Sequence, residues 1–358
     1  MKRLLLILSF LIGFISLHAQ QNNVEKLIHE GVELHDQGEY RKAIEKYNEA
    51  LKLDNKSVLA TYELALSYLA LKEYNNASRL STQVINSNNK QLLAGAYAVK
   101  SEALAGLNKL DDAIALLKEG LEKNGDTYLL HFNLALNYFN KRDIENTLLH
   151  VKQAIDIDKS NSGAFLLNAY ALSDKGLWVQ SLLAFQMFLL LEPDSRRSKN
   201  AFDEMLQTMR IKSFTDKPVE RSFIQQQLFR NQTSQGVHPS DIPPLSTVDG
   251  LNRNFVYHAI TTTLDSLKKE NETPDVYTTF KVVNKEIIKI LERENKSSND
   301  GIFWNFYVPF FSHLAQSKYY DTYTRYISVS YIPESLDWWQ ENPKEAENFV
   351  VWFEKGDH

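Results

Sequence analysis

Small and apolar residues recur along the first half of the chain in a pattern that repeats about every 34 residues. Each period holds two apolar stretches at helical spacing, separated by a short polar turn. The first stretch carries a small residue that allows close approach of a second helix, and a bulky residue beside the turn fills the gap between the two. The small residues are Gly31, Ala65, Ala135 and Ala169, and the bulky ones are Tyr40, Tyr74, Leu110, Ile144 and Trp178. The pattern therefore predicts five helix pairs.

The first period, GVELHDQGEYRKAIEKYNEALKLDN, resembles the tetratricopeptide repeat through residues such as Gly31, Gly38, Tyr40 and Ala43. The resemblance covers residues 24–212 and recurs in register, with repeats that begin near Val24, Val58, Ala94, Tyr128 and Ser162. One such pair cannot bury its apolar side alone, so at least three must stack. The resemblance thus implies an all-α solenoid over residues 20–212, in which residues 196–212 form a closing helix with a polar outer face.

Beyond Lys212 the repeat ends. Residues 213–248 read as a linker with one short amphipathic helix, 219–229, followed by a loop that contains Gly236 and three prolines. Helical spacing returns in residues 249–358, where Thr273 and Pro274 have the pattern of a helix start, with Thr273 as the candidate cap. Residues 301–353 are dense in aromatic side chains. We expect an aromatic-rich, α-helical C-terminal domain there, with no resemblance to a known family.

The first 19 residues have the pattern of a secretory signal peptide. Lys2 and Arg3 precede an apolar run from Leu4 to Leu17, and Ala19 is the expected cleavage position. The run is shorter than the roughly 20 apolar residues that span a bilayer. The chain has no cysteine, which excludes disulfides, thiolate metal ligands and a cysteine-linked lipid anchor. These features predict export without a lipid anchor, most simply into a bacterial periplasm.

The composition of the chain is that of an ordinary folded protein. Hydrophobic residues make up 43% and charged residues 24%, and the net charge of -5 offers no basic surface for nucleic acid. No phosphate-binding loop, Gly-x-Ser-x-Gly turn or His-Glu-x-x-His motif occurs, and the histidines are scattered. We therefore expect no catalysis, no cofactor and no bound metal. Acids and bases can still meet in space, so a hydrolase-type enzyme in the C-terminal domain is a third alternative.

The family resemblance implies that the first helix of each pair lines a concave face. Positions that hold Lys and Asn in carboxylate-gripping members of the family are here occupied by Ile28, Tyr62, Ala98 and Phe132, so that function is not carried over. The face is instead apolar, and an exposed apolar surface of this kind is typical of a contact site. Its residues are Ile28, Val32, Tyr62, Leu66, Leu69, Leu129, Phe132, Leu136, Phe139, Leu166 and Tyr170.

Two occupants of this face remain open: an apolar helix or extended peptide from another protein, or the chain's own residues 213–248. Our main hypothesis is a non-enzymatic adaptor of the bacterial cell envelope that binds another protein in this way. The alternative is a carbohydrate-binding accessory protein in which Trp304, Trp338 and Trp339 form an exposed patch for glycan. Against that patch stands a simpler interpretation, in which the aromatic residues form a helical core.

Overall fold

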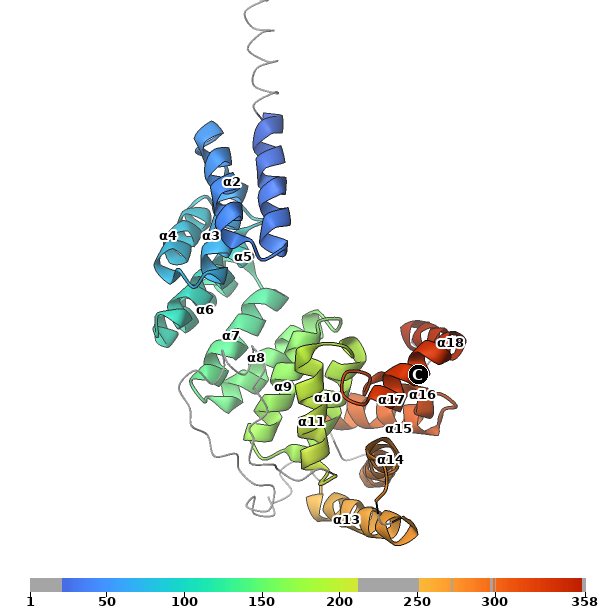
Figure 1. Ribbon diagram of the computed structural model, residues 1–358. Coiled ribbons are helices and arrows are strands. Elements are labelled where there is room, and N and C mark those ends of the chain that lie inside the picture. The colour runs from blue at the N-terminus through green and yellow to red at the C-terminus, as the bar shows by residue number, and fades with distance from the viewer. Residues whose placement is uncertain (1–20, 212–250, 272, 297–298, 300, 356–358) are drawn as a thin grey trace, which may run out of the picture. The chain divides into compact units, whose positions relative to one another are not determined.

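The computed structural model describes residues 21–211, 251–271, 273–296, 299 and 301–355 (Figure 1). All regular structure within these residues is helical. The expected signal peptide, Lys212 and the linker 213–248 with its short helix lie outside the described residues. The helices gather in two compact units, Met1–Asp143 and Ile144–His358. The repeat pattern predicts a boundary after residue 212, whereas this division separates the two helices of the fourth repeat.

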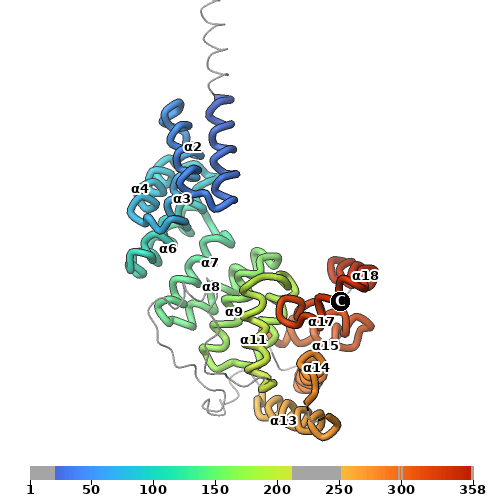
Figure 2. The backbone as a smooth tube through the Cα atoms, in the orientation of Figure 1, coloured from blue at the N-terminus to red at the C-terminus, as the bar shows by residue number. Residues whose placement is uncertain are grey.

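The first unit contains helices of the first four repeats. A helix over residues 21–36 is followed by six more: α2 (Tyr40–Leu53), α3 (Val58–Ala70), α4 (Tyr74–Asn86), α5 (Leu93–Gly106), α6 (Leu110–Asn124) and α7 (Tyr128–Asn140). Each of α2 to α6 contacts the helix that follows it in the chain. The backbone trace shows each first helix turning back into its second helix (Figure 2). The predicted helix pairing is therefore confirmed.

The second unit begins with the remaining repeat helices α8 (Ile144–Ile157), α9 (Ser162–Asp174), α10 (Trp178–Leu191) and α11 (Arg196–Thr208). The C-terminal helices follow: α13 (Arg253–Glu270), α14 (Val276–Glu294), the π-helical turn η2 (Phe303–Tyr307), α15 (Val308–Gln316), α16 (Tyr320–Tyr326), α17 (Pro333–Glu341) and α18 (Pro343–Lys355). The cap of α14 is Asp275, whose Oδ1 accepts from the Thr278 N–H at 2.7 Å, and not Thr273 as the sequence suggested. A carboxylate one residue before the helix satisfies its free N–H groups better than a side chain three residues away.

One turn geometry joins first and second helices throughout the array. A residue with positive φ follows each first helix, and the next N–H reaches back to a carbonyl five residues earlier, as in Glu39 to Leu34 at 2.8 Å. The positive-φ residues are Gly38, Lys72, Asn108, Arg142 and Gly176. The second helices then begin at Tyr40, Tyr74, Leu110, Ile144 and Trp178, which are the bulky residues singled out in the sequence.

The closing helix α11 is built like a sixth first helix. Ser195 Oγ caps it by accepting from the Ser198 N–H, just as Ser57 caps α3. At its other end Arg210 has positive φ, and the Ile211 N–H reaches the Leu206 carbonyl at 2.9 Å, which reproduces the repeat turn. Arg196 and Lys199, expected on its polar outer side, are exposed, whereas Asn200, Phe202 and Asp203 are covered.

The C-terminal helices supply that cover. Phe202 of α11 is fully buried, and its ring meets Phe280 of α14 edge to face at 4.8 Å. Polar contacts add to the packing: Tyr331 donates to Asp203 at 2.6 Å, and Tyr323 donates to Gln186 of α10 at 2.5 Å. Twelve successive residues of α10 are buried. The last repeat is therefore the core of the second unit.

Glycine allows the closest approach in the first unit. A Cβ atom at Gly31 would lie 2.4 Å from Cε1 of Tyr47, a fully buried ring on α2. Real Cβ atoms do not come so near, so Gly31 is required for this helix contact. Ala65, Ala135 and Ala169, the matching small residues of other repeats, are also fully buried.

Candidate binding face

The first helices of the first unit carry most of the residues expected to bind a partner. α5 contacts both α3 and α7, so the three helices lie in series. Seven of the expected residues are partly exposed, and we call them the first-helix face: Val32, Tyr62, Leu66, Leu69, Leu129, Phe132 and Leu136. Two others, Ile28 and Phe139, are buried at 6% and 4% exposure and serve the core.

Side chains of the face are held by their neighbours rather than free. The Tyr62 hydroxyl of α3 lies 2.4 Å from the position a Cβ would take at Gly95 of α5, so the ring reaches across to the next first helix. Tyr128 and Phe132 on α7 stack with their ring centroids 5.5 Å apart. Fixed rings lose little conformational entropy on binding, which favours their use in an interface.

The N-terminal end of this region carries negative charge. Glu63 of α3 is half-buried, and burial together with the nearby Asp36 raises the pKa of its carboxyl above the ordinary value. No lysine or arginine lies within ion-pair distance of Glu63 among the described residues. In the same unit, His35 Nδ1 shares a 2.8 Å hydrogen bond with Ser67 Oγ of α3, and burial lowers the pKa of the imidazole. A cation brought by a partner would offset the charge of Glu63.

Leu166 and Tyr170 were expected on the same face, and this expectation is wrong. Leu166 is fully buried and Tyr170 is 4% exposed, within a run of nine buried residues on α9. The neighbouring Asn168 lies 3.5 Å from the Tyr307 hydroxyl of η2, and Tyr170 meets Phe185 edge to face at 5.2 Å. The neighbouring repeat helices, together with η2 at Asn168, cover this first helix, so Leu166 and Tyr170 offer no contact surface.

The expectation that three tryptophans form an exposed aromatic patch is wrong for one of them, Trp304. Trp304 is 2% exposed and packs against Phe303 in the core, because η2 turns the indole inward. Trp338 and Trp339 are both half-buried. Trp339 packs against Tyr326 at 5.1 Å and Trp338 packs on Arg325, so the neighbouring tryptophans face different protein groups. The aromatic residues form a cluster in the C-terminal region, and Trp304 takes no part in an exposed glycan surface.

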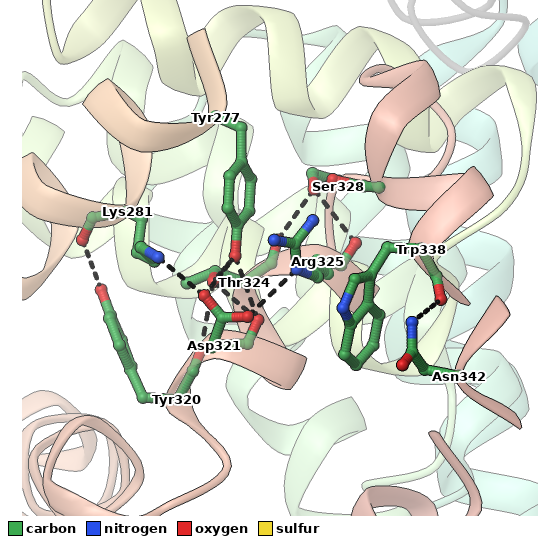
Figure 3. Close-up of polar contacts among 10 residues, drawn as sticks. Tyr277, Lys281, Tyr320, Asp321, Thr324, Arg325, Ser328, Trp338 and Asn342 are labelled. Carbon is green, nitrogen blue, oxygen red and sulfur yellow. Dashed lines mark hydrogen bonds and ion pairs between the residues drawn. The ribbon is translucent and has the colours of Figure 1, made fainter. Parts of the chain in front are cut away.

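The C-terminal helices hold a polar cluster that the sequence pattern does not predict (Figure 3). The Asp321 carboxylate on α16 accepts from Lys281 Nζ at 2.7 Å, from the Tyr277 hydroxyl at 2.9 Å and from Arg325 Nε at 3.0 Å. Burial acts to raise the pKa of Asp321, but these donors outweigh it and hold the pKa below its ordinary value. Only the Asp321–Arg325 spacing of four residues could have been noticed in the sequence.

Within residues 21–355, as far as they are described, no three histidine or carboxylate side chains come together as metal ligands would. The described helices include none that is both long enough and apolar enough to cross a bilayer.

Part of the repeat region matches a known family model. Residues 31–72 match the family model described as a TPR repeat, and the match does not extend into the C-terminal half. BBSome complex member BBS4 from Bos taurus is 26% identical over 129 residues, which are 36% of this chain and 24% of that protein. The chain thus matches about a quarter of that relative's length.

Solved structures of TPR proteins are also similar. A thermophilic TPR protein of Thermus thermophilus, TTC0263, is 21% identical, with 52% of this chain and 99% of that chain covered and a TM-score of 0.46. PilF of Pseudomonas aeruginosa is 15% identical, with 54% and 86% covered and a TM-score of 0.45. YrrB, a TPR protein with an unusual peptide-binding site, is 16% identical, with 53% and 96% covered and a TM-score of 0.37. At TM-scores below 0.5 these likenesses support no conclusion about function.

Proposed function

We propose that this chain, whose N-terminal part consists of tetratricopeptide repeats, is a non-catalytic adaptor that binds another protein on the first-helix face of its first unit. The observation that carries the proposal is the partly exposed apolar series Tyr62, Leu66 and Leu69 on α3 and Leu129, Phe132 and Leu136 on α7. Isolated apolar residues are common on protein surfaces, whereas an apolar series along helices of one stacked array is typical of an interface.

The chemistry of the partner follows from the face. Apolar side chains would pack on the rings and aliphatic groups of α3 and α7, and a helix or an extended peptide can present them at suitable spacing. A lysine or arginine in the partner would lie at Glu63, where the carboxyl is half-buried and lacks a cation. The partner is therefore an apolar peptide segment that includes a basic residue.

The cellular setting of the proposal rests on the sequence. The signal-peptide pattern of residues 1–19 and the absence of cysteine favour an envelope complex in the bacterial periplasm. The adaptor would then hold an exported protein in place rather than act on it. Of the alternatives, the glycan-binding function has lost Trp304 from its proposed surface.

The test replaces two residues of the face. Leu66→Glu with Phe132→Glu should abolish capture of a stoichiometric protein partner from envelope fractions, because both charges would be buried against apolar groups. Leu149→Glu, at a 52% exposed leucine on α8, is the matched control and should retain capture. Circular dichroism checks that all variants remain helical. Undiminished capture by the double variant would refute the proposal.

A photo-crosslinking amino acid at Phe132 distinguishes the two occupants. Under the proposal, the cross-link joins the chain to a different protein. A cross-link from position 132 to a peptide within residues 213–248 of the same chain would mean that the protein covers its own face, and the adaptor proposal would fall.

A further inference from the structure

Arg325 of α16 lies between two aromatic rings from different helices (Figure 3). Its guanidinium carbon is 4.3 Å from the ring centroid of Tyr277 on α14 and 5.0 Å from that of Trp338 on α17. The side chain is 20% exposed, so it is held in place yet still reaches solvent. Cation–π contacts with two rings restrict the position of the guanidinium group and leave N–H donors for hydrogen bonds.

Only one edge of the guanidinium group is used within the described protein. Nε donates to Asp321 Oδ2 at 3.0 Å, whereas the two terminal nitrogens have no hydrogen-bond or ion-pair partner among the described residues. Arginine carries five N–H donors, and the pair on its terminal nitrogens matches the two oxygens of a carboxylate. A partly desolvated cation with free donors favours binding of an anion.

The local charge balance limits which anion fits. Lys281 Nζ lies 2.7 Å from Asp321 Oδ1, so two cations contact one carboxylate, and these three side chains together carry one net positive charge. A single carboxylate would neutralise it. A phosphate dianion would instead leave negative charge close to Asp321, which lies only 3.0 Å from Arg325.

We propose that Arg325 is a second, separate binding site of this protein, which takes the carboxylate of an aspartate or glutamate side chain on a protein partner. A sugar acid carries the same group, but sugar rings stack on open aromatic faces. The two indoles beside the site are already engaged, Trp338 by Arg325 and Trp339 by Tyr326. The engaged rings favour an acidic peptide, and Tyr277 and Trp338 act as positioning residues for Arg325.

A peptide pair that differs only in the carboxylate tests the site. Acetyl-Ala-Glu-Ala-amide should bind the full chain at least about tenfold more tightly than acetyl-Ala-Gln-Ala-amide, measured at low ionic strength from the NMR signal of the Arg325 Nε–H group. Arg325→Lys should remove most of this preference, because lysine keeps the charge beside Asp321 but lacks the planar pair of donors. Arg293→Lys, at an exposed arginine of the same unit, is the matched control and should retain the preference.

Three results would overturn the inference. Equal binding of the two peptides by the unaltered protein would exclude a carboxylate site, and this measurement does not depend on whether any variant folds. Tighter binding of a glucuronic acid oligomer, without binding of the glutamate peptide, would assign the site to a glycan. Stronger competition by inorganic phosphate than by acetate would contradict the charge balance. Failure of partner capture through the first-helix face leaves this peptide measurement unaffected.

Discussion

Gly31→Ala should change the free energy of unfolding through two effects of opposite sign. Replacing a glycine inside a helix by alanine normally stabilises the helix by about 1 kcal/mol. At Gly31, however, the new methyl carbon would lie 2.4 Å from Cε1 and 2.8 Å from both Cδ1 and Cζ of Tyr47. Tyr47 is fully buried, so its ring has no free space to move into. Overpacking of this kind costs about 1–3 kcal/mol, and contact with three ring atoms puts Gly31 at the upper end.

We therefore expect Gly31→Ala to lower the free energy of unfolding by about 1–2 kcal/mol. Urea denaturation followed by far-ultraviolet circular dichroism measures the change. Tyr47→Leu removes the ring, and in that background the alanine should become neutral or stabilising, which gives a coupling energy of about 2 kcal/mol in the double-mutant cycle. If Gly31→Ala alone stabilises the protein by the full helix-propensity gain, the close contact with Tyr47 plays no part in stability and the reasoning is wrong.

Three further predictions concern other parts of the structure. Lys72→Gly should raise the free energy of unfolding by about 1 kcal/mol, because Lys72 has a φ of 61°, where glycine is unstrained. Lys72→Ala is the control and should show no such gain in the same denaturation assay. The pKa of Glu63 is raised in the folded protein, so as pH rises this carboxyl ionises first in the unfolded state. The group therefore stabilises the fold at low pH, and this contribution is lost as pH rises above the ordinary value of 4.5. Glu63→Gln should therefore flatten the pH dependence of stability just above pH 4.5, and an unchanged profile would contradict the assignment. Phe202→Ala should cost about 3–5 kcal/mol in the same assay, because the ring is fully buried and packs against Phe280 and Tyr331; a much smaller loss would contradict this packing.

The repeated helix pairs could be read from the sequence because their determinants are local. The first residues of α3, α7 and α9 coincide with the predicted repeat starts, and that of α5 differs by one residue. A small residue at a helix contact or a bulky residue at a turn has the same role in each repeat, so position in the period predicts its place. The positive φ of Lys72 and Arg142 was not predicted, because the residue type gives no sign of it.

Exposure was decided by tertiary structure. Phe132 and Leu166 occupy equivalent positions in two successive repeats, yet Phe132 remains partly exposed while Leu166 is fully buried in the second unit. The periodic pattern specifies which side of a helix a residue lies on, but not what covers that side. Trp304 was misplaced for the same reason, since aromatic residues occur both in cores and in binding surfaces.

The polar cluster around Arg325 depended on long-range contacts in the same way. Asp321 and Arg325 are one helical turn apart, but Tyr277 and Lys281 come from a helix about 40 residues earlier in the chain. By itself, therefore, the sequence determined the helices, their pairing and the apolar side of each, because these follow from interactions between near neighbours in the chain. Only the tertiary structure decided which of those sides remain accessible and which charged groups meet, because both depend on the packing of distant segments.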